Sequence, residues 1–263
     1  MNNELKHRLS NGKWMITAEG YSKLMSTLDN PLPKVNHNDE FIVEGAEEMG
    51  IVVVDVCGVL MYGVSEEDEL THGVCDVGRL YECLEELAED STVSEIVLSI
   101  TSPGGETSYI PETGKLIKYI NDNIKPVRVW IPKQCASAAY WLASQAGSIG
   151  ACESADIGSV GVYTLIEDST KALDMAGIKI DAISSGKYKL IGHSFRSLTD
   201  EERTILQDDV TKTHEQFKTV IQANRNIARE DLEGLSYDGT TALSKGFVDV
   251  LVDDLDNFLT IEQ

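Results

Sequence analysis

Short runs of β-branched and other apolar residues alternate with segments of helical periodicity through the middle of the chain. Three runs of strand length, IVVVDV (51–56), EIVLSI (95–100) and VRVWI (127–131), are almost continuously apolar, which is typical of strands covered on both faces. Between the first two runs, apolar residues recur with helical spacing from Val77 onward, and Asp76 is placed to cap that helix. Strands that alternate with helices predict an α/β domain with a largely parallel sheet.

The strand pattern begins at Ile51, so we expect residues 51–263 to form one domain and residues 1–50 to precede it as a leader. Within the leader, residues 15–28 are compatible with one helix. A linker at 30–38 follows, because two prolines and three asparagines in this stretch favour turns and loops.

Charge and cysteine content exclude several classes of protein. The 263 residues include 22 basic and 44 acidic ones, for a formal net charge of −22. This argues against a nucleic-acid partner, which needs a basic stripe. The five cysteines form no CxxC pair, so neither a metal site nor a disulfide framework is indicated, and no cofactor is expected. With no apolar run of about 20 residues and no signal peptide, we expect a cytoplasmic protein without a membrane partner.

The C-terminal half supplies two further local signals. IKIDAI (178–183) is strand-like, and Thr199-Asp-Glu-Glu202 is a capping box ahead of a long helix. An apolar stripe that includes Leu206 and Phe217 gives this helix one face to bury.

Three segments contain residue types that carry chemistry, and each also has an ordinary structural explanation. Ser102-Pro-Gly-Gly105 either turns the backbone sharply and leaves N–H groups for an anion, or is a plain tight turn. Ser137 lies at a helix start, where it feels the helix dipole or simply caps the helix. The loop 185–189 holds two lysines, and a lysine acts as a base only when burial or a nearby cation favours its neutral form.

The order of these segments resembles the signal peptide peptidase A (SppA-like) family of Ser-Lys peptidases, and within it the phage branch of prohead (capsid assembly) protease C proteins. Besides the SPGG turn, CASAAYWLAS and SGKYK, the likeness includes IGSVGV (157–162) and YDGTTALSKGFVD (237–249). It runs from about Met15 to Val252. The resemblance implies a ClpP/crotonase-like α/β fold, a spiral of ββα units, here with a long C-terminal helix. Proteins with this fold tend to assemble into rings.

The resemblance also implies a catalytic pair. Ser137 would be the nucleophile and Lys189 the base that takes its proton. Lys187 is the alternative base, but position 189 matches the family lysine. Ser159 matches a family serine that hydrogen-bonds the lysine. His193 is a second alternative base, which would resemble the ClpP type of site.

Backbone groups complete the expected site. The N–H groups of Gly105 and Ala138 would form the oxyanion hole, and Gly104, Gly105 and Glu106 would bind an extended substrate by strand addition. The sequence departs from many relatives at Ala139, where they have glycine. Cys135, two residues before the serine, is interpreted as a packing residue.

The implied function is a serine endopeptidase that forms an acyl-enzyme and processes scaffold or capsid proteins during phage prohead maturation. It would act in the host cytoplasm or inside an assembling prohead, as a homo-oligomer and most simply a ring. Two alternatives remain open. One is a soluble bacterial SppA-like peptidase that degrades signal or other peptides, and the other is a catalytically silent ring-forming scaffold module. A crotonase-type acyl-CoA enzyme lacks any signal for a CoA site.

Overall fold

In the computed structural model of the chain, residue 8 and residues 12–32, 42–43 and 50–261 are described. The central element is a six-stranded sheet, parallel throughout except at one edge, where β2 runs antiparallel to β3. Its strands in spatial order are β14 (Val250–Leu251), β10 (Ser148–Ala151), β8 (Val127–Ile131), β6 (Glu95–Thr101), β3 (Ile51–Cys57) and β2 (Ile42–Val43).

The predicted spiral of ββα units is confirmed by the elements that follow each of three strands of this sheet. After each of β3, β6 and β8 the chain enters a short strand in another sheet and then a helix. In the first unit α3 (Glu66–His72) and β5 (Val74–Asp76) intervene before the helix. The short strands and helices of the three units are β4 (Val59–Met61) with α4 (Val77–Glu89), β7 (Gly104–Glu106) with α5 (Ile110–Asn123), and β9 (Gln134–Ala136) with α6 (Ala138–Ala143).

The leader contributes a strand to the same body. β1 (Lys13–Ile16) lies between β12 (Tyr163–Thr164) and β7 in a five-stranded sheet ordered β12–β1–β7–β4–β5. Trp14 and Met15 are fully buried, and α2 (Ala18–Asp29) follows directly. The leader therefore packs into the sheet system of the expected domain. The boundary at residue 50 stays a prediction, and most of the expected linker, 33–38, lies outside the described residues.

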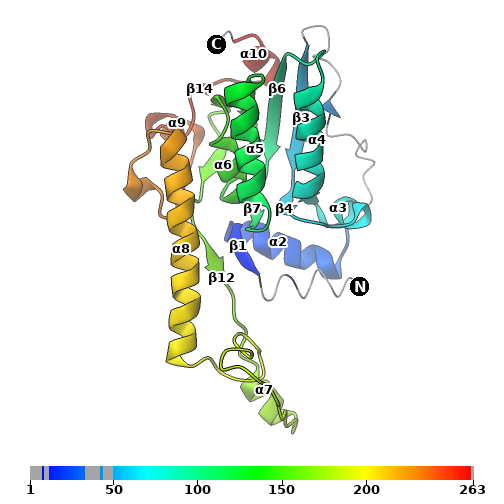
Figure 1. Ribbon diagram of the computed structural model, residues 1–263, viewed down its shortest axis with the longest axis vertical. Helices are drawn as coiled ribbons and strands as arrows, with labels where there is room; N and C mark the ends of the chain where they lie inside the picture. Colours follow the sequence, from blue (N-terminus) through cyan, green and yellow to red (C-terminus); the bar gives the residue numbers. More distant parts are fainter. Residues whose placement is uncertain (1–7, 9–11, 33–41, 44–49, 262–263) are drawn as a thin grey trace.

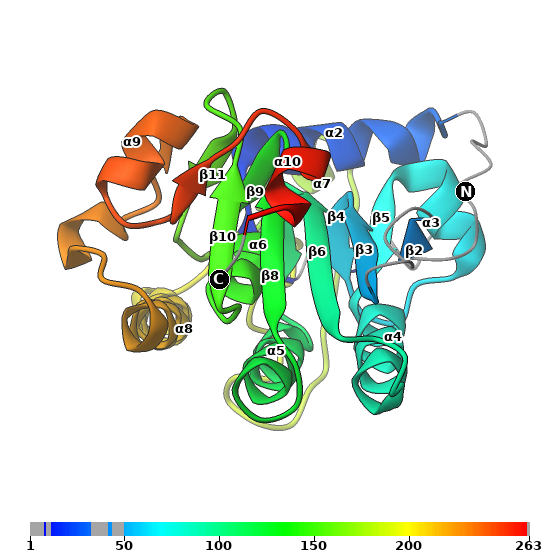
Figure 2. The ribbon, with the colours of Figure 1, turned by 90° about the horizontal axis from the view of Figure 1, so that it is seen from above.

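The two helix caps predicted from the sequence are confirmed. The Asp76 side chain accepts a hydrogen bond from the Gly78 amide at the start of α4. Thr199 and Glu202 form the predicted capping box at the start of α8 (Asp200–Asn224). Helices α4, α5 and α8 lie on one side of the central sheet, and α2 lies on the opposite side of the molecule (Figure 2).

The C-terminal region closes the fold beside the central sheet. Here β13 joins β11 and β9 in a three-stranded sheet. The remaining elements are β11 (Asp156–Gly158), the short 3-10 helix Arg229–Asp231, β13 (Ser236–Tyr237), α9 (Gly239–Ser244) and α10 (Leu255–Leu259). No helix in the described ranges has the length and apolar character needed to cross a membrane.

Residues 165–199, which we call the projection, extend beyond the N-terminal end of α8 and carry α7 (Thr170–Met175) (Figure 1). The strand predicted at 178–183 does not form in this single chain. Ile178 is 53% exposed and Ile183 is 97% exposed. A strand requires a neighbouring strand for its hydrogen bonds, and none of the described strands lies beside this segment.

Candidate active site

Ser137 is the single residue between strand β9 and helix α6. Its backbone has φ 55° and ψ −119°, a region that non-glycine residues rarely adopt and that costs about 1–3 kcal/mol. The residue is only 1% exposed. Its N–H donates to the carbonyl of Gly158 at 2.7 Å, and its Oγ lies 3.4 Å from the carbonyl oxygen of Gly161. A buried serine hydroxyl on strained backbone is an arrangement found at functional sites.

The first glycine of the SPGG turn makes room for this serine. Gly104 has φ +100°, and a Cβ placed on it would lie 2.9 Å from Cβ of Ser137 and 2.1 Å from the carbonyl oxygen of Met15. A Cβ on Gly105 would lie 1.9 Å from the carbonyl oxygen of Leu60. Both glycines are therefore required by close backbone packing, which supports the prediction that SPGG is more than a plain turn.

A cavity of about 500 Å³ is lined by Gly161, whose carbonyl oxygen lies beside Oγ of Ser137. Ser159 and Gly161 line it on one side, the leader residues Ile16 and Thr17 on another. Ser159 also has a positive φ, 50°, and its N–H donates to the carbonyl of Leu235 at 2.7 Å. The loop that ends β11 thus wraps around the serine and opens onto this cavity.

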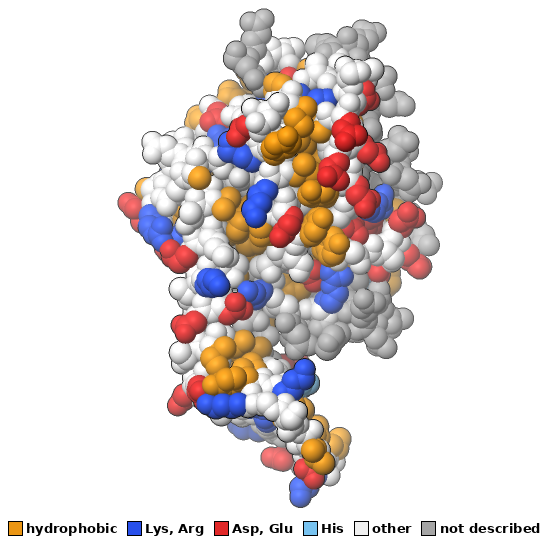
Figure 3. Space-filling model, viewed as in Figure 1, with side chains coloured by type: hydrophobic (Ala, Val, Ile, Leu, Met, Phe, Trp, Pro, Cys, Tyr) orange, Lys and Arg blue, Asp and Glu red, His pale blue; other side chains and the backbone are white. Residues whose placement is uncertain are grey.

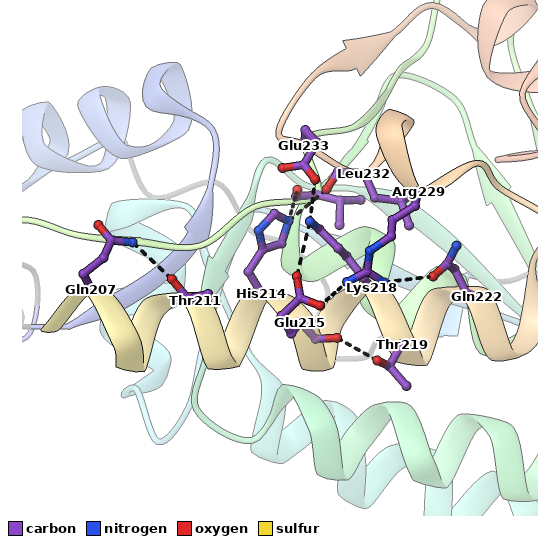
Figure 4. Close-up of polar contacts among 11 residues, drawn as sticks. Gln207, Thr211, His214, Glu215, Lys218, Thr219, Gln222, Arg229, Leu232 and Glu233 are labelled. Atoms are coloured by element: carbon purple, nitrogen blue, oxygen red, sulfur yellow. Dashed lines mark hydrogen bonds and ion pairs between the residues drawn. The ribbon is translucent and has the colours of Figure 1, made fainter. Parts of the chain in front are cut away.

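Helix α8 is hydrogen-bonded to two loops that contribute lining residues to this cavity, and Figure 4 shows its polar contacts. Nε2 of His214 lies 3.0 Å from the carbonyl oxygen of Val160 and 2.9 Å from that of Leu232. Because both partners are acceptors, the network assigns the ring hydrogen to Nε2. Next along the helix, the buried Lys218 pairs with Glu233. The sequence analysis did not single out His214, since only the fold brings these two carbonyls to it.

Lys189 is not brought to Ser137. It lies on the projection, where its side chain is exposed and its backbone N–H donates to the Gly186 carbonyl at 3.2 Å. Over the described ranges, no hydrogen bond joins Lys189 to Ser137 or to Ser159. The assignment of the base therefore stays a prediction.

The two alternative bases also lie on the projection. Lys187 forms an ion pair with Glu201 at 2.6 Å, and this hydrogen bond raises the pKa of Lys187. A raised pKa favours the charged amine, the opposite of what a base requires. The ring of His193 stacks on Phe195, with centroids 5.2 Å apart.

The strand expected to bind substrate, β7, already has a partner strand on each side. β7 pairs antiparallel with β1 and parallel with β4, so Gly104–Glu106 offers no open edge in this chain. The sequence analysis missed β1 as a strand because its partners, β7 and β12, are remote in sequence. Ala138, the other expected oxyanion donor, is the first residue of α6 and is fully buried.

Neighbouring residues have structural roles. Cys135 is fully buried, and burial raises the pKa of its thiol, so the thiolate needed for a nucleophile is disfavoured. Ala139 is also fully buried, with its methyl group in the main core. Among the residues that the structure describes, no group of three or more His, Cys, Asp or Glu side chains is placed to hold a metal ion.

Comparisons with known proteins identify the family of this chain. The sequence model of peptidase family S49 matches residues 120–260. The chain is 28% identical over 218 residues to the putative protease MJ0651 of Methanocaldococcus jannaschii, covering 81% of this chain and 70% of that protein. It is 29% identical over 210 residues to the capsid assembly protease C of Escherichia phage lambda, covering 79% of this chain and 47% of that protein.

A third relative is the putative signal peptide peptidase SppA of Enterococcus faecium, 26% identical over 215 residues, which is 80% of this chain and 62% of that protein. The similarity therefore spans about four fifths of this chain but, in the phage and Enterococcus relatives, less than two thirds of theirs.

Proposed function

This chain belongs to peptidase family S49, and from that premise we propose that it is a serine endopeptidase in which Ser137 attacks the substrate and Lys189 takes its proton. Both residues lie within the matched range, 120–260. The observation that carries the proposal is the position of Ser137, which lies on strained backbone against Gly104 and whose Oγ is 3.4 Å from the carbonyl oxygen of Gly161, a residue that lines a cavity.

In the proposed reaction, the neutral Lys189 amine removes the proton from Oγ of Ser137 as the oxygen attacks the scissile carbonyl carbon. The N–H groups of Gly105 and Ala138 bind the resulting oxyanion. The proton then passes from Lys189 to the leaving amine as the C–N bond breaks. Water, deprotonated by the same lysine, hydrolyses the acyl-enzyme and regenerates Ser137. Ser159 holds the lysine in place.

A second copy of the chain would supply the base. Lys189 is exposed on the projection, which extends away from the body that holds Ser137 (Figure 1). A lysine becomes an effective base when it is desolvated, and contact with a neighbouring copy would bury it. We therefore propose that Ser137 of one copy and Lys189 of the next form each active site.

The surface of the projection fits such an assembly. Hydrophobic side chains gather on it (Figure 3). Met175 is 85% exposed, Ile183 is 97% exposed, and Ile180 and Tyr188 are also exposed. Exposed apolar groups at this density mark an interaction surface, and residues 178–183 need a partner strand. Head-to-tail contacts of this kind close into a ring when the rotation permits, so we propose a homo-oligomeric ring.

We place its substrates among phage scaffold and capsid proteins, cleaved in the host cytoplasm or inside an assembling prohead. The similarity to a capsid assembly protease supports this choice. The match to a putative signal peptide peptidase favours one alternative, a bacterial enzyme with the same site acting on other peptides. Portal and capsid genes beside the coding sequence would favour the phage role.

The test is mass spectrometry of a scaffold or capsid protein co-expressed with the enzyme and its variants. Ser137→Ala and Lys189→Ala should each abolish cleavage, while Lys187→Ala should retain it. Cleavage that survives Lys189→Ala but is lost in His193→Ala would refute the assignment of the base. The silent ring-forming module would be favoured if the unsubstituted enzyme left the scaffold intact and a serine-directed fluorophosphonate probe did not label Ser137.

A further inference from the structure

The leader strand β1 lies where an extended substrate is expected. We propose that the strip between β7 and β12 is the substrate-strand site, that it takes extended segments with a basic residue followed by bulky apolar ones, and that β1 is its resident occupant. This rests on the proposed function, because it takes Ser137 as the nucleophile.

Backbone pairing supports the first step. β1 is antiparallel to β7 on one side and to β12 on the other. Trp14 pairs with Glu106 and with Tyr163, so the leader bridges two strands that are remote from each other in sequence. Strand addition of this kind is a general way to hold an extended peptide, because main-chain hydrogen bonds fix its position.

The occupant also lies beside the nucleophile. A Cβ placed on Gly104 would lie 2.1 Å from the carbonyl oxygen of Met15 and 2.9 Å from Cβ of Ser137. The Met15 carbonyl and the Ser137 side chain are therefore close neighbours. Ile16 and Thr17 then line the cavity that Ser159 shares. A substrate carbonyl must come close to the Ser137 side chain to be attacked, and the Met15 carbonyl of the leader already lies close to that side chain.

A side-chain contact also holds the leader against β7. Arg8 donates to both carboxylate oxygens of Glu106, at 3.0 Å from Nε and 2.5 Å from the second nitrogen. The same guanidinium donates to the carbonyl of Tyr62 at 2.7 Å. Glu106, one of the three residues expected to bind substrate, is therefore engaged by the leader through its backbone and its side chain.

The neighbours of β1 define the class of segment that fits. Trp14 and Ile16 pack into one apolar cluster and Met15 into the main core. Lys13 pairs with Asp209 at 2.9 Å and donates to Thr213 at 3.1 Å, both on α8. A substrate in the same place would present a basic residue to α8 and apolar residues to the two clusters.

The consequence is self-occlusion. An occupant on the same chain competes at an effective concentration in the millimolar range. A substrate segment therefore binds only when β1 leaves the strip, and activity on other proteins depends on release of the leader.

One test locks the leader in place. Lys13 and Thr164 are directly paired across β1 and β12, and such pairs lie at a distance that suits a disulfide. Oxidised Lys13→Cys/Thr164→Cys should cleave a reporter peptide at least tenfold more slowly than the same protein after reduction. In a Ser137→Ala background, the oxidised form should also bind the peptide at least tenfold more weakly than the reduced form. The two single-cysteine variants under the same oxidant control for the native cysteines.

A second test loosens the leader and measures binding without catalysis. In a Ser137→Ala background, Trp14→Ala should bind a fluorescent peptide NGKWMITA at least tenfold more tightly than the parent, as measured by anisotropy. Met61→Ala changes no residue of β1 and removes a side chain from the cluster that would hold the resident strand and the added peptide alike, so it should give no such gain. Circular dichroism checks that each variant is folded.

Equal peptide binding by the oxidised and reduced lock would overturn the proposal, as would a folded Trp14→Ala variant that binds no better than Met61→Ala. If binding follows the lock as expected while no variant cleaves any peptide, the strand site stands and the peptidase function fails. Cleavage that is lost in Ser137→Ala but unaffected by the lock leaves the function intact and refutes the resident strand.

Discussion

Gly104→Ala is expected to damage the fold and the nucleophile together. The new Cβ would lie 2.1 Å from the Met15 carbonyl oxygen, a backbone atom in a paired strand that has little freedom to move, and 2.9 Å from Cβ of Ser137. The residue would also hold φ +100°. Backbone strain and overpacking together predict a loss of about 3–5 kcal/mol in the free energy of unfolding. We expect the peptidase rate to fall by more than about tenfold, because the displaced atom carries Oγ.

Urea unfolding followed by circular dichroism measures the stability loss. Gly63→Ala is the matched control, because Gly63 has φ +65° with nothing within 4 Å of its added Cβ. This control pays only the backbone strain, about 1–2 kcal/mol. If Gly104→Ala is no less stable than Gly63→Ala, then β1, β7 and Ser137 do not meet as described, and the site geometry is wrong.

Three further predictions follow from the same contacts. Mixing equal amounts of Ser137→Ala and Lys189→Ala protein before assembly should restore about one quarter of the unsubstituted activity, the share of junctions with both groups intact; no recovery would refute a shared site. The Arg196 guanidinium lowers the pKa of Glu202 from 4.5 to about 2, so this contact stabilises the protein above about pH 4.5 and is lost as pH falls toward 2. Glu202→Gln should therefore flatten the acid limb of the stability profile, and an unchanged limb would contradict this role. His214→Ala should lower kcat about tenfold by leaving two loop carbonyls unpaired, and His214→Gln, which keeps an N–H donor, should recover part of it; equal loss in both variants would show that the donor is not what matters.

Features encoded within a few neighbouring residues were predictable from the sequence. The three continuous apolar runs became the central strands β3, β6 and β8, because burial on both faces leaves an unambiguous local pattern. The caps at Asp76 and Thr199 need only residues two or three positions away.

Features that depend on distant partners were not predictable in the same way. β1 has a short and ordinary sequence, and its strand character comes from β7 and β12. Residues 178–183 have the right pattern for a strand but no partner strand among the described residues of one chain. The surroundings of Ser137 were expected from the SPGG turn and from IGSVGV, since both segments come directly from strands beside β9. The position of Lys189 relative to Ser137 was not predictable from the sequence, because it depends on how the projection packs against another copy of the chain.

Covalent labelling of the enzyme by its substrate tests the central claim most directly. Acid-quenched mixtures of enzyme and an activated peptide ester, analysed by intact-mass and peptide mass spectrometry, should show one acyl group per chain, located on Ser137 and absent from Ser137→Ala. An acyl group on any other residue, or undiminished turnover in Ser137→Ala, would contradict the account.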